Sequence, residues 1–157
     1  MGRKTFIEAF EHLNQPVPFQ AYLNQYHVVE VIEREFNELR NHFYIAEADG
    51  EFAGFCKLVL DEDEQHPALI GHKCLELERI YVLKQYQRMK VGYLLLNKAE
   101  EIGRQLNFDI LWLGVWEKNT KAIEIYRKWG FMEFGQHSFN LGGDIQTDLM
   151  MKKSLTL

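Results

Sequence analysis

A strand-like run followed by a polar loop and a helix is the part of the sequence best suited to binding an anion. The run Leu77–Val82 leads into a loop over 84–90, and apolar spacing predicts a helix over Val91–Leu106. The first turn of a helix has backbone N–H groups without intrahelical partners, and the helix dipole adds positive potential there. Gly92 would let the backbone approach a phosphate closely, or would supply a dihedral that other residues avoid. The loop also carries two basic residues, Arg88 and Lys90.

The same segment is equally compatible with an ordinary connection between a strand and a helix. Neither the Walker A pattern GxxxxGK[ST] nor the Rossmann pattern GxGxxG occurs in it. The strand before the loop carries two carboxylates, Glu76 and Glu78, which share one face because strand side chains alternate. Such a carboxylate could act as a general base, or it could face solvent or pair with Arg79.

A second segment adds a candidate proton donor. A helix is predicted over Asn119–Trp129, with Gly130 in the position that commonly ends helices. Tyr126 lies on this helix, and a phenol with a reference pKa of about 10 can give a proton to a leaving group. The alternative for Tyr126 is a packing role in the core. Asn119 is also a suitable N-cap of its own helix.

Together the two segments resemble the GNAT superfamily of acetyl-CoA-dependent N-acetyltransferases. The loop pattern of that family, [Q/R]-x-x-G-x-[G/A], is matched by Gln87 and Gly92, whereas Lys90 stands at the usual first glycine and must keep a backbone geometry that suits glycine. The signature N-x-x-A-x-x-x-Y-x-x-x-G-F is matched at every position by Asn119, Ala122, Tyr126, Gly130 and Phe131. The resemblance extends roughly from Phe43 to the C-terminus.

Within the superfamily, the sequence resembles bacterial spermine/spermidine N-acetyltransferases. The similarity lies in the stretches 111–119, 137–139 and 146–148. It implies a small cationic amine, such as a polyamine, as the acetyl acceptor. The net charge of −5 is compatible with a cationic acceptor. The resemblance places the N-terminal helices at the acceptor groove, and these helices carry four acidic residues, Glu30, Glu33, Glu35 and Glu38.

The resemblance also implies roles for individual residues, with acetyl-CoA as cosubstrate. Glu78 is the expected general base, with Glu76 as the second candidate, and Tyr126 is the expected general acid for the departing thiolate. Backbone groups of Ile80, Tyr81 and Val82 are expected to pair with the pantetheine arm. The backbone amides of Arg88, Met89, Lys90, Val91, Gly92 and Tyr93 are expected to hold the pyrophosphate, and Gln87 is expected to belong to the same cofactor-binding loop. Asn119 is expected either to bind the pantetheine or to cap its helix, and Lys121 and Lys128 to reach the cofactor phosphates.

The elements that position these residues form an α/β (α+β) pattern. Helices are predicted over 5–12, 19–26 and 28–39. Three antiparallel strands follow over 42–47, 52–60 and 74–82. After the helix over 91–106 come a strand, a helix and two strands over 109–116, 119–129, 131–140 and 146–153. The expected fold is a GNAT-like mixed, mainly antiparallel sheet flanked by helices. It lacks the first strand with which members of the superfamily usually begin.

Length and charge restrict the remaining options. A chain of 157 residues suits one domain over 1–157. With 18 basic and 23 acidic residues, it is not expected to bind nucleic acid. No apolar run is long enough to span a membrane, and the N-terminus lacks an export signal, so a cytoplasmic location is expected. The two cysteines form no CxxC pair, and two histidines near the acidic run at 61–64, His66 and His72, follow no metal-ligand spacing, so we expect no metal.

Two other functions are compatible with the sequence. One is acetylation of a protein or peptide N-terminus, and the other is binding of acyl-CoA by a regulator without turnover. The presence of both Glu78 and Tyr126 favours an enzyme. The natural acceptor and the oligomeric state, for which a homodimer is one option, are left open by the sequence.

Overall fold

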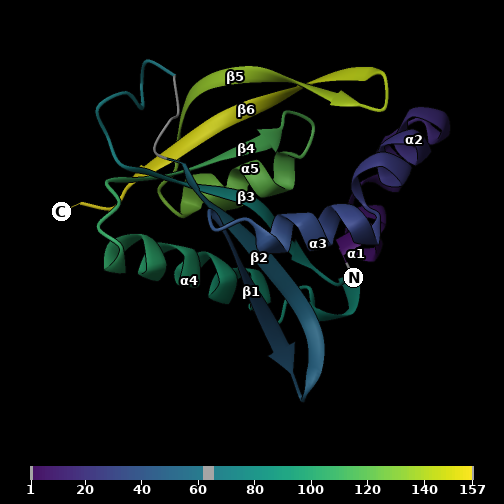
Figure 1. The fold of residues 1–157 in the computed structure, drawn as a ribbon, viewed down its shortest axis with the longest axis horizontal. Coiled ribbons are helices and arrows are strands. Elements are labelled where there is room, and N and C mark those ends of the chain that lie inside the picture. Colours follow the sequence, from purple (N-terminus) through teal and green to yellow (C-terminus); the bar gives the residue numbers. More distant parts are fainter. Residues whose placement is uncertain (1, 62–65, 157) are drawn as a thin grey trace.

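A computed structural model describes residues 2–61 and 66–156, and its centre is a six-stranded sheet with the strand order β1-β2-β3-β4-β6-β5 (Figure 1). The strands are β1 (Asn41–Ala48), β2 (Glu51–Asp61), β3 (Cys74–Val82), β4 (Ile110–Trp116), β5 (Met132–Leu141) and β6 (Asp144–Ser154). The β3–β4 pair is parallel and the other four pairs are antiparallel. The predicted mixed, mainly antiparallel sheet is therefore confirmed.

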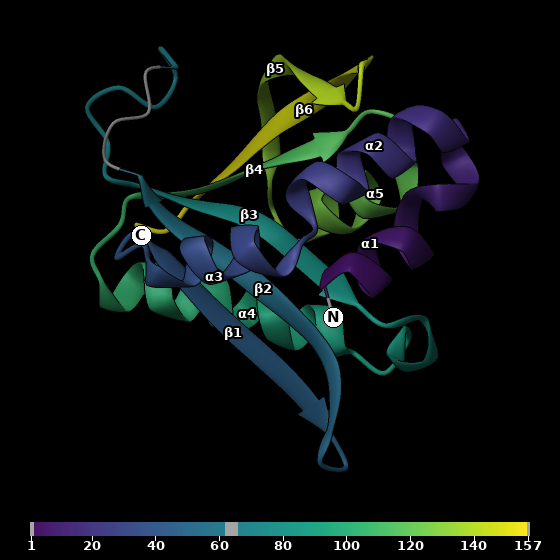
Figure 2. The same cartoon turned by 45° about the vertical axis from the view of Figure 1, so that its right-hand side comes forward.

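Helices cover both faces of this sheet. The helices are α1 (Gly2–Phe10), α2 (Pro16–Tyr26), α3 (Val29–Asn37), α4 (Val91–Gln105) and α5 (Thr120–Lys128). Figures 1 and 2 show α1, α2 and α3 on one face, and α4 and α5 on the other. As predicted, the described residues before β1 are helical and contain no strand. Pro16 opens α2 at its first position, three residues before the predicted start, because proline lacks only an N–H that the first turn leaves unpaired anyway.

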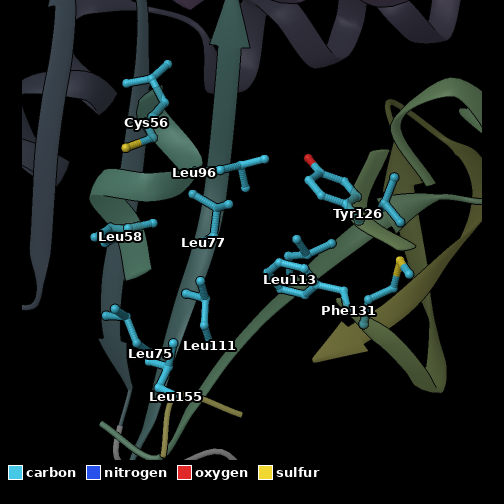
Figure 3. Packing of buried hydrophobic residues seen from close by; sticks show 14 of the residues in the cluster. Cys56, Leu58, Leu75, Leu77, Leu96, Leu111, Leu113, Tyr126, Phe131 and Leu155 are labelled. Carbon is cyan, nitrogen blue, oxygen red and sulfur yellow. The ribbon is translucent and has the colours of Figure 1, made fainter. Parts of the chain in front are cut away.

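The main core lies between the sheet and the helices α4 and α5. Alternation along β3 and β4 sends Leu75, Leu77, Leu111 and Leu113 into this core, where each side chain is at most 2% exposed (Figure 3). The residues between them, Glu76 and Trp112, face the opposite side of the sheet, where Trp112 packs with Leu69 and Met150. Alternation therefore decides which β3 carboxylates can reach a site between the sheet and α1.

The amphipathic pattern of the third helix predicts its presence but not its environment. No residue of α3 is buried, and Val29 and Phe36 are 68% and 58% exposed. Phe36 stacks on Phe43 of β1, with ring centroids 4.2 Å apart. The helix is attached to the sheet by this stack and by ion pairs of Glu35.

The N-terminal helices surround a buried histidine. The ring of His27 packs on Phe6 at a centroid distance of 4.6 Å, and its Nδ1 is buried without a hydrogen-bond partner. Burial first, and then the charges of Arg79 and Arg3, lower its pKa from 6.5 to about 4. Because the folded state binds protons less readily than the unfolded chain, stability is fully present above the unfolded pKa and is lost as the pH falls toward 4.

We therefore expect His27 to make stability depend on pH between 6.5 and 5. A pKa difference of this size corresponds to a loss of about 2 kcal/mol over that window. Urea unfolding at several pH values measures the free energy of unfolding of wild type, His27→Phe and the exposed control His12→Gln. This free energy should fall between pH 6.5 and pH 5 in wild type and in the control, but not in His27→Phe. An equal slope in His27→Phe would assign the effect to other groups.

Candidate active site

The strands β3 and β4 separate part-way along their length and leave a cavity between them. Their pairing begins at Cys74 and Ile110 and ends at Glu76 and Trp112, although both strands continue beyond these residues. A cavity of about 360 Å³ lies at this separation, a size typical of small-molecule sites. Beyond Glu76, the edge of β3 that faces β4 is therefore unpaired with β4. An extended ligand that carries amide groups could pair with this edge of β3 as an added strand does.

The cavity brings together part of the predicted cofactor-binding set. All three of the expected pantetheine residues pair with β2, but only Ile80 and Tyr81 line the cavity, and Val82 does not. Asn119 and Tyr126 line the opposite wall. The loop over 87–93, together with Lys121 and Lys128, contributes nothing to the cavity wall, and both lysines are exposed on α5.

A bulge in β3 determines how Glu78 is presented. The register passes from Lys57 opposite Arg79 to Leu58 opposite Leu77, so Glu78 is the extra residue. A bulge bends a strand and redirects its side chains. As a result Glu78 and Arg79, which simple alternation would place on opposite faces, both line the cavity, together with Glu76.

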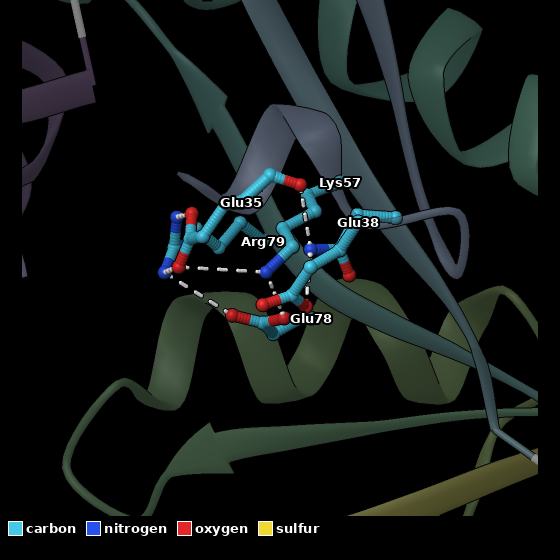
Figure 4. Close-up of polar contacts among 6 residues, drawn as sticks. Glu35, Glu38, Lys57, Glu78 and Arg79 are labelled. Carbon is cyan, nitrogen blue, oxygen red and sulfur yellow. Dashed lines mark hydrogen bonds and ion pairs between the residues drawn. The ribbon is translucent and has the colours of Figure 1, made fainter. Parts of the chain in front are cut away.

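Glu78 belongs to a network of four charged side chains (Figure 4). Its two carboxylate oxygens lie 2.6 Å from Lys57 Nζ and 3.2 Å from Arg79 Nη2. The ion pair with Arg79 that the sequence left open is therefore present, together with a place on the cavity wall. Lys57 is only 4% exposed, and the Glu78 side chain is 30% exposed. Two cations thus hold the carboxylate in one orientation while part of it faces solvent and the cavity.

Glu35 of α3 completes this network. It accepts two hydrogen bonds from Arg79, at 2.7 and 2.8 Å, and lies 3.5 Å from Lys57 Nζ. Burial would raise the pKa of Glu35, but the hydrogen bonds and charge of Arg79, with Lys57, outweigh burial and lower it. Glu35 therefore stays charged at neutral pH, and the network connects α3 to β2 and β3.

Tyr126 extends from α5 into the cavity. Its ring packs edge-on against Phe131 at a centroid distance of 5.8 Å, and its hydroxyl points toward β3 (Figure 3). Burial raises the pKa of Tyr126 to about 12, so the phenol keeps its proton throughout the physiological range. At the start of the same helix, Asn119 Oδ1 accepts a hydrogen bond from the Ala122 N–H at 3.3 Å. The capping role of Asn119 is confirmed, and its side chain also lines the cavity.

The loop before α4 has the unusual backbone that its sequence predicts. Lys90 is left-handed, with φ at 63°, and Arg88 is left-handed as well, with φ at 72°. A left-handed conformation at a residue other than glycine destabilises the fold by about 1 kcal/mol or more, and residues strained in this way are common at functional sites. Two amides of the predicted cofactor-binding loop are already used, because the N–H groups of Gln87 and Met89 donate to the carbonyls of Lys84 and Tyr86, each at 3.3 Å. The N–H groups of Val91, Gly92 and Tyr93 form the first helical turn and are the stronger candidates.

Gly92 corrects one sequence expectation. It has no positive φ, so no forbidden dihedral requires glycine there. A Cβ at this position would meet only Val82 Cγ2, at 3.8 Å, which is an ordinary contact. Any requirement for a small residue must therefore come from a ligand rather than from the fold.

We expect Gly92→Val to weaken acetyl-CoA binding without lowering stability. Branched methyl groups at the helix start would keep phosphate oxygens away from the first-turn amides. Gly92→Ala is the matched control, and it should retain binding and gain about 0.5–1 kcal/mol of stability from helix propensity. Calorimetric titration with acetyl-CoA and thermal melts of both variants measure the two effects. Normal binding by Gly92→Val would remove the loop from the phosphate site.

Several cavity residues have no signal in the sequence that would assign them to a site. They are Phe6, Phe10, Asn14 and Tyr22. Five others also line the cavity but appear in the sequence only within stretches that resemble polyamine acetyltransferases, namely Gly114, Trp116, His137, Gln146 and Asp148. The tertiary fold brings all of them together from α1, α2, β4 and the β5–β6 hairpin.

Two further observations concern what the described residues do not form. Within 2–61 and 66–156, no three His, Cys, Asp or Glu side chains are grouped so as to hold a metal ion. Residues 62–65 of the predicted acidic loop lie outside the described residues. No helix in the described part of the chain is long and apolar enough to cross a membrane.

Comparison with known proteins connects this geometry to a family. The model of the acetyltransferase (GNAT) family matches residues 6–131. An uncharacterized N-acetyltransferase from the pepI 3′ region of Lactobacillus delbrueckii subsp. lactis is 36% identical over 155 residues, covering 99% of this chain and 88% of the relative. Spermidine N(1)-acetyltransferase of Escherichia coli K12 is 27% identical over 141 residues, covering 85% of this chain and 68% of that protein.

A solved structure supports the fold. The PaiA N-acetyltransferase of Thermoplasma acidophilum, crystallised with coenzyme A, superposes with a TM-score of 0.76 at 21% identity, covering 97% of this chain and 87% of that one. The split between β3 and β4, the strained turn before α4 and the buried phenol of Tyr126 fit an acyl-CoA thioester. The chain belongs to the acetyltransferase (GNAT) family and is an acetyl-CoA-dependent N-acetyltransferase.

Proposed function

We propose that this enzyme acetylates a primary amine of a small cationic acceptor, of which a polyamine is the best candidate. The observation that carries the proposal is the closure of the acceptor side of the cavity. Asn14, which follows α1, accepts a hydrogen bond from Gln146 of β6 at 2.7 Å. At the β5–β6 turn, Gly142 packs so tightly on α2 that a Cβ would lie 1.9 Å from the Pro18 carbonyl oxygen. An extended peptide needs an open groove, whereas a small amine fits beneath this bridge.

The lining of the cavity favours a cation. Three carboxylates contribute to it, those of Glu76, Glu78 and Asp148. Aromatic rings form much of the remainder, and a cation is attracted to both groups. The aromatic residues are Phe6, Phe10, Tyr22, Tyr81, Trp116 and Phe139.

The acidic residues of the N-terminal helices do not contribute as the sequence led us to expect. Glu30, Glu33 and Glu38 are exposed and do not line the cavity. Glu35 is held by Arg79 and Lys57. Glu78 is paired with the same two cations, so the attraction for a cationic acceptor is assigned to Glu76 and Asp148 on the strands.

Two residues on opposite walls are proposed to move the protons. Acetyl-CoA supplies the acetyl thioester, and the acceptor must lose a proton first, because an ammonium has no lone pair to attack with. Glu78 accepts this proton, directly or through water, at the part of its carboxylate that is not covered by Lys57 and Arg79. Tyr126 donates its proton toward the departing sulfur. Ile80 and Tyr81 hold the pantetheine arm by their backbone groups.

A thiol-release assay with a panel of acceptors tests the proposed substrate class. Spermine and spermidine should exceed propylamine in kcat/KM by at least about tenfold, the effect of one charge-assisted contact. A peptide with a free N-terminus should be poorer still, because the Asn14–Gln146 bridge blocks its path. If the peptide were acetylated faster than every polyamine, the enzyme would be an N-acetyltransferase of proteins instead.

A further inference from the structure

The register of four strands places two acidic groups on either side of Gly114. Because Glu76 pairs with Trp112 in the parallel β3–β4 pair, Glu78 lies approximately level with Gly114. On the other side, Trp116 pairs with Asp148 of β6, and Asp148 pairs with His137 of β5. Glu78 therefore approaches the region above Gly114 from β3, and Asp148 approaches it from β6.

Gly114 is the floor of this region. It lies within β4, where its neighbours are large, and a glycine inside a strand often marks the close approach of another group. A Cβ on Gly114 would lie 3.1 Å from His137 Cε1 and 3.6 Å from Asp148 Oδ2. The imidazole and the carboxylate thus lie directly over the backbone of Gly114, inside the cavity.

Asp148 has the surroundings of a cation-binding group. Its side chain is 17% exposed, and its Oδ2 lies 3.5 Å from His137 Nε2. Trp116 lies beside it on β4, and the ring of Phe10 meets that of Trp116 edge-on at 6.4 Å. A carboxylate beside an aromatic ring and largely shielded from water attracts an ammonium more strongly than an exposed carboxylate does.

We propose that Asp148 binds a second, non-reacting ammonium of the acceptor while the first amine reacts beside Glu78. This inference rests on the proposed acetylation of small cationic amines and assigns the residue that selects among them. Because β3 and β4 are no longer paired at this level, β3 and β6 are more than two strand spacings, about 10 Å, apart, and the side chains reach inward from both. The space between them suits a short aliphatic diamine unit, such as one end of spermidine. Asp148 therefore distinguishes diamines and polyamines from monoamines.

Asp148→Asn tests this assignment because it removes the charge and keeps the shape. The KM for spermidine should rise about 10- to 100-fold, the effect of losing a charge-assisted contact, with kcat nearly unchanged. The KM for propylamine, which has no second ammonium, should stay constant. Asp148→Glu should recover part of the spermidine affinity. Glu117→Gln is the matched control, since it removes an exposed carboxylate next to Trp116 that does not line the cavity.

The outcomes separate this proposal from the one on which it rests. A spermidine KM unchanged in Asp148→Asn overturns the assignment of Asp148, and so does an equal rise for spermidine and propylamine. If wild type acetylates neither amine, the proposed function itself fails, and the assignment of Asp148 fails with it. Thermal melts with and without acetyl-CoA verify that each variant is folded and binds its cosubstrate.

Discussion

Tyr126→Phe should lower kcat by about 10²- to 10⁴-fold while acetyl-CoA affinity stays unchanged, because only a proton donor is removed. The ring packs against Phe131 and is 9% exposed, and phenylalanine preserves that packing. Burial raises the pKa of Tyr126 to about 12, so the hydroxyl is protonated at every pH at which the enzyme can be assayed. Steady-state kinetics and calorimetric titration of acetyl-CoA measure the two quantities.

The control for this substitution is Tyr44→Phe. Tyr44 lies on β1 outside the cavity, so its loss of a hydroxyl should leave kcat unchanged. Because the Tyr126 hydroxyl does not ionise near neutrality, the mutant should differ from wild type by a constant factor between pH 6 and pH 10. If chemistry limits turnover and Tyr126→Phe keeps the wild-type kcat, then Tyr126 is a packing residue.

Lys57→Met should destabilise the fold by about 3 kcal/mol. Lys57 is 4% exposed and pairs with both Glu35 and Glu78, so its removal leaves two carboxylates close together with only Arg79 to neutralise them. Breaking a buried ion pair costs about 3–5 kcal/mol, and we expect the lower end because Arg79 remains and Glu78 is partly exposed. Urea unfolding at pH 7 measures the difference.

Lys98→Met is the matched control for the buried lysine. Lys98 pairs with Glu101 at 3.0 Å on the surface of α4, where such a pair contributes at most about 1 kcal/mol. Adding Glu35→Gln to Lys57→Met should restore part of the lost stability, since it removes one of the uncompensated charges. Equal losses in Lys57→Met and Lys98→Met would show that the network contributes no more than a surface pair.

Local patterns in the sequence predict most of the elements, and the resemblance to the GNAT superfamily predicts the mixed, mainly antiparallel sheet. Alternation along β3 places Glu76 and Glu78 on one face, and the spacing from Asn119 to Phe131 predicts a helix that carries Tyr126. The left-handed geometry expected at Lys90 is present because it depends on neighbouring residues alone. These features are local, and so they can be predicted without knowledge of the tertiary structure.

The rest of the site depends on contacts between distant segments. Glu35 and Arg79 are 44 residues apart, and nothing in either segment indicates the pair. The bulge at Glu78 places Arg79 on the cavity wall against the alternation, and the early end of β3–β4 pairing opens the cavity itself. Gly114, His137 and Asp148 meet only through the register of β4, β6 and β5. Exposure of α3 likewise follows from where the helix docks rather than from its pattern.

The pH–rate profile of Glu78→Gln is the measurement that tests the proposed chemistry most directly. With spermidine as acceptor and acetyl-CoA saturating, kcat/KM at pH 7 should fall by about 10²-fold or more, the contribution of a general base. Raising the pH toward the amine pKa, about 10, should recover part of this loss, because the acceptor then supplies its own neutral form. Glu76→Gln, which removes the second β3 carboxylate of the cavity, serves as the comparison. A Glu78→Gln profile with the wild-type height and shape would contradict the assignment of Glu78 as the base.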